Sequence, residues 1–154
     1  MITPPSPDCT IAEARSWLRE LVDDGAHCPV CTQFAKTYRR KIHATMARDL
    51  IHVYRKVGTD WFHVRVIGGH PGDFAKLVYW RLIEPDEGVR EDGSTRTGWW
   101  RITHAGVAWL SGRTRLPKYA RIYDGRCMNL YGDPQTIRDA LGARFNYDEL
   151  MRGE

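Results

Sequence analysis

Long apolar runs are absent from this sequence. No stretch approaches the ~18 consecutive apolar residues that a membrane-spanning helix needs. The first residues, MITPPSPDCT, also lack the basic-then-apolar order of a signal peptide. We therefore expect a cytoplasmic protein that makes no membrane contact and whose four cysteines are reduced.

Enzyme signatures are absent as well. The chain contains no Gly-x-Ser-x-Gly, no phosphate-binding loop, no dinucleotide fingerprint and no His-Glu-x-x-His. Its six histidines are scattered along the sequence, and each is better explained as a surface or core residue than as a catalytic base. We therefore predict that the protein is not an enzyme.

The composition is that of an ordinary globular protein. Of the 154 residues, 42% are hydrophobic and 27% are charged, which is enough apolar material for one compact domain or one domain with a small addition. The net charge of +4 suits nucleic acid or an acidic partner, but many proteins without such partners share it.

Two helices are predicted in the first third of the chain. Thr10-Ile-Ala-Glu13 has the pattern of a capping box, so a helix should run from there to about Val22 and bury Ile11, Ala14, Trp17 and Leu18. A long helix is predicted from about Thr32 to Val57, because apolar residues recur there at the helical period: Ile42, Met46, Leu50, Val53 and Val57.

The middle of the chain alternates between strand and helix signals. Residues 61–66 alternate and are rich in β-forming residues, so they are predicted to form a strand. Asp73 is predicted to cap a helix that runs from about Phe74 to Ile83. Thr103 is predicted to cap another helix from about His104 to Leu110.

The last forty residues predict a β-hairpin followed by short helices. Asp124-Gly125 is a typical two-residue hairpin turn inside the segment 118–131, and alternation directs Ile122, Met128 and Leu130 inward. Asp133-Pro134 is predicted to open a helix that ends at Leu141-Gly142. Asn146 is predicted to cap a final short helix.

The segment from Gly72 to Leu110 resembles the second half of a MarR-like winged-helix domain. In that family a recognition helix is followed by Gly-Leu-Ile, a charged wing and an aromatic strand ending in Thr-x-x-Gly-x-x-x-Leu. The matching positions here are Leu82, Ile83, Gly98, Trp100, Ile102, Thr103, Gly106 and Leu110. Arg81 stands where the pattern usually has glycine, which predicts a different end to the helix.

The resemblance implies an α+β fold built on a winged-helix core. The expected organisation is a disordered lead-in (1–9), an N-terminal helix with a CxxC knuckle (10–31), the winged helix (32–112) and a C-terminal β-hairpin plus helix (113–154). The layout also resembles uncharacterised bacteriophage and prophage proteins, which implies expression in a bacterial host cytoplasm.

The function implied by the resemblance is binding of double-stranded DNA, as in a bacterial or phage transcriptional regulator. The recognition helix of such proteins enters the major groove, and wing arginines track phosphates or the minor groove. The expected DNA-contacting residues lie on the long helical segment, the recognition helix and the wing: Arg40, Lys41, Arg48, Arg55, Lys76, Tyr79, Arg81, Arg90, Arg96 and Arg101.

An alternative is a phage-encoded protein-binding adaptor or inhibitor that uses the winged helix as a docking surface. The wing region favours it, because it carries five acids that repel phosphate: Glu84, Asp86, Glu87, Glu91 and Asp92. The basic run on the long segment is also compatible with a solvated helix face. No long terminal helix pair of the kind that forms MarR-like dimers is present, so we expect a monomer or weak dimer.

Cys28-x-x-Cys31 has the spacing of a half zinc site. Two such thiolates bind one Zn²⁺, and a structural site needs four ligands. The candidates for the remaining ligands are Cys9, His27, His43 and Cys127. Three interpretations stay open: structural zinc, a plain pair of cysteines, and a thiol-redox pair, although the βαβ context typical of redox enzymes does not precede the motif.

Overall fold

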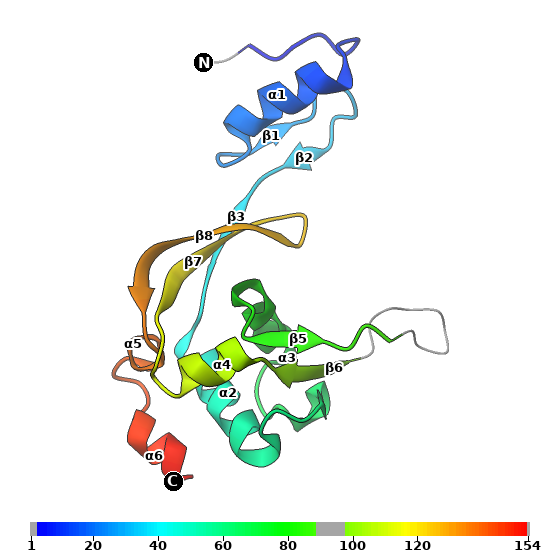
Figure 1. Ribbon diagram of the computed structural model, residues 1–154. Coiled ribbons are helices and arrows are strands. Elements are labelled where there is room, and N and C mark those ends of the chain that lie inside the picture. Colours follow the sequence, from blue (N-terminus) through cyan, green and yellow to red (C-terminus); the bar gives the residue numbers. More distant parts are fainter. Residues whose placement is uncertain (1–2, 89–97, 154) are drawn as a thin grey trace. The chain divides into compact units, whose positions relative to one another are not determined.

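The computed structural model describes residues 3–88 and 98–153, and it is a mixed α+β structure with small sheets (Figure 1). The described chain divides into two compact units. Unit 1 comprises residues 1–40 and 121–129, and unit 2 comprises residues 41–120 and 130–154. No helix among the described residues is long and apolar enough to cross a membrane.

Unit 1 begins with helix α1 (Ile11–Leu21), whose start is as predicted. The Thr10 hydroxyl accepts the N–H of Glu13, and the Glu13 carboxylate accepts the N–H of Thr10, so the capping box is complete. The buried face is narrower than expected, because Ala14 is buried but Ile11 is exposed. Trp17 and Leu18 are half-buried.

The predicted long helix from Thr32 to Val57 was wrong over nearly its first half, residues 32–43. Strands β1 (Ala26–His27) and β2 (Phe34–Ala35) form an antiparallel pair, and β3 (Tyr38–Lys41) follows. Helix α2 (Ala44–Val57) starts only after them. The reason is non-local: β3 is the edge strand of a sheet whose order is β3-β7-β8, and no local periodicity reports that pairing. Arg40 and Lys41 therefore lie on a strand.

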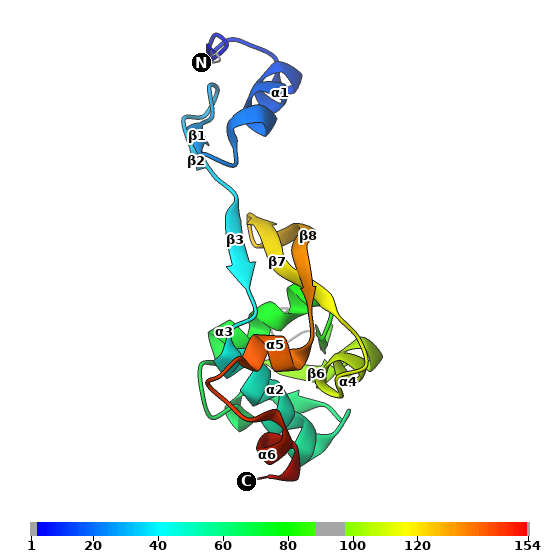
Figure 2. The same cartoon turned by 90° about the vertical axis from the view of Figure 1, so that its left-hand side faces the viewer.

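Helix α2 forms the centre of unit 2 and confirms the apolar stripe. Met46, Leu50, Ile51 and Val53 are buried along it. The helix packs against four other helices of the unit, α3, α4, α5 and α6, and its contacts with α5 (Ile137–Leu141) and α6 (Tyr147–Arg152) can be followed in Figure 2.

A second three-stranded sheet lies in unit 2, and its strand order is β4-β6-β5. Both pairings are antiparallel, with Phe62 opposite Trp100 and Ile83 opposite Ile102. The strands are β4 (Phe62–His63), β5 (Ile83–Pro85) and β6 (Trp99–Ile102). The predicted strand 61–66 is shorter than expected, because residues 64–66 form a 3₁₀ turn, η1 (Val64–Val66).

The helical segment before β5 differs from its prediction. It consists of a short α-helix, α3 (Pro71–Ala75), that tightens into a 3₁₀-helix, η2 (Lys76–Trp80). Its first cap is His70 and not Asp73, because Pro71 occupies the first helical position. Its last cap, Arg81, has φ 59°, so it takes the left-handed conformation that glycine favours in helix ends.

The elements that follow are largely as predicted. Helix α4 (His104–Leu110) is capped by the Thr103 hydroxyl, which accepts the N–H of Gly106 at 2.9 Å. Strands β7 (Leu116–Tyr123) and β8 (Arg126–Gln135) form the hairpin, and Asp124 and Gly125 at its turn both have positive φ.

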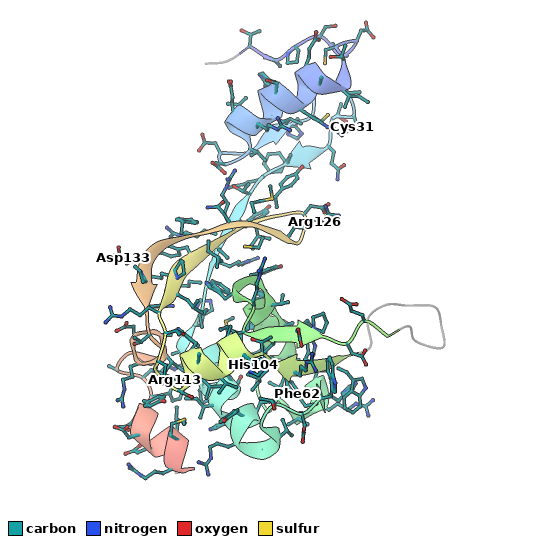
Figure 3. The ribbon with its side chains drawn as sticks, in the orientation of Figure 1. Cys31, Phe62, His104, Arg113, Arg126 and Asp133 are labelled. Carbon is teal, nitrogen blue, oxygen red and sulfur yellow. The ribbon has the colours of Figure 1, made fainter. Side chains whose placement is uncertain are left out.

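Two expectations about the C-terminal segment were wrong. Asp133 lies on strand β8 and opens no helix (Figure 3), since the strand continues to Gln135 and Thr136 is the cap of α5. Met128 is 55% exposed, whereas Ile122 is buried as expected. The end at Gly142 and the Asn146 cap of α6 are confirmed.

Candidate nucleic-acid and partner surfaces

The structure places the ten predicted DNA-contacting residues in different settings. Arg90 and Arg96 lie outside the described residues. Arg40, Lys41, Arg55, Arg81 and Arg101 are exposed, and Arg48, Lys76 and Tyr79 are half-buried. Several of them take part in interactions within their own unit.

Arg48 forms an ion pair with the buried carboxylate of Asp49. Its Nε and Nη2 atoms donate to Oδ1 of Asp49 at 3.2 and 3.1 Å, and its guanidinium lies over the ring of Phe145, 5.0 Å from the centroid. Asp49 is buried, and removing one partner of a buried ion pair is strongly destabilising. The geometry gives Arg48 a structural role in the α2 helix.

Arg55 also acts inside unit 2. Its Nη1 atom donates to the carbonyl oxygen of Met151, near the end of α6. Carbonyls in the last turn of a helix have no partner within the helix, so a cation there stabilises the helix end. Both arginines that were expected to form a DNA-contacting face on α2 thus connect α2 to C-terminal residues.

The segment α3–η2 presents a small polar surface of its own. Lys76 donates to Asp73 at 3.0 Å, and this contact is the main cause that holds the pKa of the Asp73 carboxyl below its usual value. Tyr79 is half-buried one turn further on. Arg81 is exposed at the end of the segment.

The outer face of the β4-β6-β5 sheet carries a second surface, which we call the tryptophan face: Trp61, His63, Glu84, Trp99 and Arg101. Arg101 pairs with Glu84 across the strands and lies 4.7 Å from the ring centroid of Trp61. His63 meets Trp99 edge to face at 5.4 Å. Trp61 and Trp99 are 41% and 43% exposed.

Strand alternation explains this face. Phe62, Ile83 and Ile102 point to the opposite side and are buried. Trp61 and His63 are not among the residues that the sequence predicts to contact a partner. The alternation of residues 61–63 and 99–102 was the signal that could have found them, once the register of β4 against β6 was known.

In unit 1, Cys28 and Cys31 lie on the loop that joins β1 and β2, and Figure 3 labels Cys31 there. The backbone N–H groups of Cys31 and Val30 donate to the Cys28 sulfur and hold the pKa of the Cys28 thiol below its usual value. Thr32 has φ 67°, and its N–H donates to the Cys28 carbonyl at 2.9 Å. The backbone of this loop therefore surrounds the sulfur of Cys28.

The expected further zinc ligands do not gather at this loop. In the part of the chain that the structure describes, no group of three or more His, Cys, Asp or Glu side chains is placed to hold a metal ion. His27 is adjacent, but its Nδ1 lies 3.0 Å from the Thr32 carbonyl oxygen and must donate to it. Cys127 contacts the carbonyl oxygen of Asn129.

Comparisons of the chain with protein-family models, with curated proteins and with solved structures found no match.

Proposed function

We propose that the protein binds double-stranded DNA through unit 2, used as a winged helix, and that it acts as a bacterial or phage transcriptional regulator. The observation that carries the proposal is the strand order β4-β6-β5 together with the position of the helical segment α3–η2 directly before β5. A winged helix has this order, with the first strand beside the third and the recognition helix leading into the second.

The side chains of the helical segment fit phosphate contacts better than base readout. Arg81 and Lys76 are the cations it offers, and Tyr79 can donate a hydrogen bond to a phosphate oxygen. The segment contains no Asn or Gln, the side chains that recognise adenine through two hydrogen bonds. The proposal therefore predicts binding that is strongly salt-dependent, with an affinity of about 1–100 µM for arbitrary sequence at physiological salt.

Arg81 offers the sharpest test. Its backbone is in the left-handed region, so Arg81→Gly removes the guanidinium and suits the backbone at the same time. We expect an unchanged or raised melting temperature and weaker binding to a labelled duplex in fluorescence anisotropy. The slope of log affinity against log salt should become shallower by about 0.9, the value for one lost phosphate contact.

Two further variants complete the experiment. Lys76→Gln should weaken binding in the same way, while Arg113→Ala is the matched control, because Arg113 is exposed after α4 and lies outside the proposed surface. If the wild-type protein shows no duplex binding at 50 mM salt, or if Arg81→Gly and Lys76→Gln bind like Arg113→Ala, the proposal is wrong.

The tryptophan face supports a second candidate function, a protein-binding adaptor or inhibitor. Trp and Arg are enriched among residues that dominate protein–protein binding energy, and here two half-exposed tryptophans flank one arginine. A protein partner would be identified by capture, purified and titrated against the chain. We then expect Trp61→Ala to reduce its affinity at least tenfold and to leave duplex binding unchanged, and equal binding by the variant would contradict this candidate.

A further inference from the structure

The loop between β1 and β2 carries two thiols, Cys28 and Cys31, which are half of the four ligands of a structural zinc site. Its two ends are fixed by the β1–β2 pairing, and the Cys28 N–H donates to the Gln33 carbonyl at 2.8 Å. The backbone N–H groups of Val30, Cys31 and Thr32 and the Cys31 thiol hydrogen-bond to the Cys28 sulfur. Paired sulfurs in a turn of this kind are the geometry in which two thiolates bind one Zn²⁺.

A structural zinc ion requires two more ligands, and the described residues of unit 1 do not place them beside the pair. No third metal-binding side chain joins the pair among residues 3–88 and 98–153. The cysteines instead line an open hollow of about 380 Å³, together with Phe34, Tyr38 and Asp124. Cys31 is exposed, so ligands can approach from outside the chain.

We propose that two copies of this chain share one zinc ion through Cys28 and Cys31 of each copy. Four thiols lose four protons to solvent, and Zn²⁺ binds the four thiolates tetrahedrally, with no change in oxidation state. The second copy is the occupant that the chemistry favours, because it supplies the two missing soft ligands in an identical preformed loop. A two-fold axis through the zinc ion relates the two copies, so the assembly stops at a dimer.

The proposal is independent of DNA binding, and it is tested on the full chain purified under reducing conditions. We expect 0.5 equivalent of zinc per chain by elemental analysis and a mass twice the 17.8 kDa of the chain by light scattering. A chelator should remove the metal and return the mass to that of one chain. Cobalt added to the metal-free protein should saturate at 0.5 equivalent, with a thiolate-to-cobalt charge-transfer band of four-sulfur intensity.

Three variants separate this arrangement from other metal sites. Cys28→Ser should abolish metal binding and the zinc-dependent dimer. Asp124→Asn should retain both, which excludes the one carboxylate that lines the same hollow. Cys127→Ser should also retain both, because its sulfur contacts the Asn129 carbonyl oxygen and has no place in the site.

Three results would overturn the proposal. One equivalent of zinc in a monomer would show that the remaining ligands come from the same chain. A metal-free protein that forms a Cys28–Cys31 disulfide on mild oxidation would show that the two cysteines are a redox-active thiol pair and not a metal site. A dimer that persists both in chelator and in Cys28→Ser would place the contact between copies elsewhere.

Discussion

Gly106 lies against the backbone of Leu82 so closely that no side chain fits between them. A Cβ at position 106 would overlap the Leu82 carbonyl oxygen and lie 2.7 Å from Cγ2 of Ile102. The same carbonyl accepts the N–H of Thr103 at 3.0 Å, and the Thr103 hydroxyl donates to the Arg81 carbonyl at 2.6 Å. Through these contacts the Thr-x-x-Gly motif packs the start of α4 against the end of η2.

This packing gives a first prediction. Gly106→Ala should destabilise unit 2 by about 2–3 kcal/mol, because backbone atoms must move to admit the methyl group. Gly72→Ala is the matched control: Gly72 is also helical, but nothing lies within 4 Å of its added Cβ. There the higher helix propensity of alanine should stabilise by up to about 1 kcal/mol. Urea unfolding measures the free energy of unfolding of both variants. Equal effects of the two substitutions would show that the close contact between Gly106 and Leu82 does not limit the side chain at position 106.

Elements that depend on local signals were predictable from the sequence. The capping residues Thr10, Thr103 and Asn146 each make the bond that their side chains predict, and the Asp124-Gly125 turn has the positive φ values it requires. In each case the deciding interaction spans three residues or fewer.

Elements that depend on distant partners were not predictable in the same way. Residues 34–41 were predicted to be helical but contain strands β2 and β3, and β3 pairs with a strand about eighty residues later. Likewise Asp133-Pro134 resembles a helix start, yet it continues strand β8. For the candidate site, the sequence identified Arg101 as a cation but not its partner, because Glu84 lies seventeen residues earlier on the neighbouring strand.

A second prediction concerns Arg48. Arg48→Ala would leave the Asp49 carboxylate buried without its guanidinium, and we expect a loss of about 3 kcal/mol in the free energy of unfolding. Arg48→Ala combined with Asp49→Asn should recover part of that loss, because no charge then remains buried. Chemical denaturation of the three proteins measures the coupling. A melting curve for Arg48→Ala that matches the wild type would show that the pair is not structural.

The Asp73–Lys76 pair predicts a pH effect. The pKa of Asp73 is lowered from its ordinary value of 3.8, chiefly by the Lys76 hydrogen bond, with smaller contributions from Lys76, His70 and His43 as nearby charges. A lowered carboxyl pKa stabilises the fold at pH above the ordinary value, and this stabilisation is lost as the pH falls below it through the folded pKa. The side chains are substantially exposed, so solvent screening keeps the effect small.

The pair is best followed by NMR titration of the Asp73 carboxyl carbon. Lys76→Gln should raise the Asp73 pKa toward 3.8, while Arg81→Gly, which removes a cation that contributes nothing to this shift, should leave it unchanged. An Asp73 titration that is the same in the wild type and in Lys76→Gln would remove the ion pair as the cause.

The C-terminal hairpin supplies a last prediction, through two residues that strand alternation alone would treat alike. Ile122 on β7 is 6% exposed, and Met128 on β8 is 55% exposed. Ile122→Asp would place a carboxylate in an apolar setting and should cost several kcal/mol, because a buried charge loses its hydration without gaining a partner. Met128→Asp keeps its new carboxylate in water and should change the free energy of unfolding by less than about 0.5 kcal/mol. Thermal unfolding followed by circular dichroism compares the two, and similar losses would show that both faces of the hairpin are covered in solution.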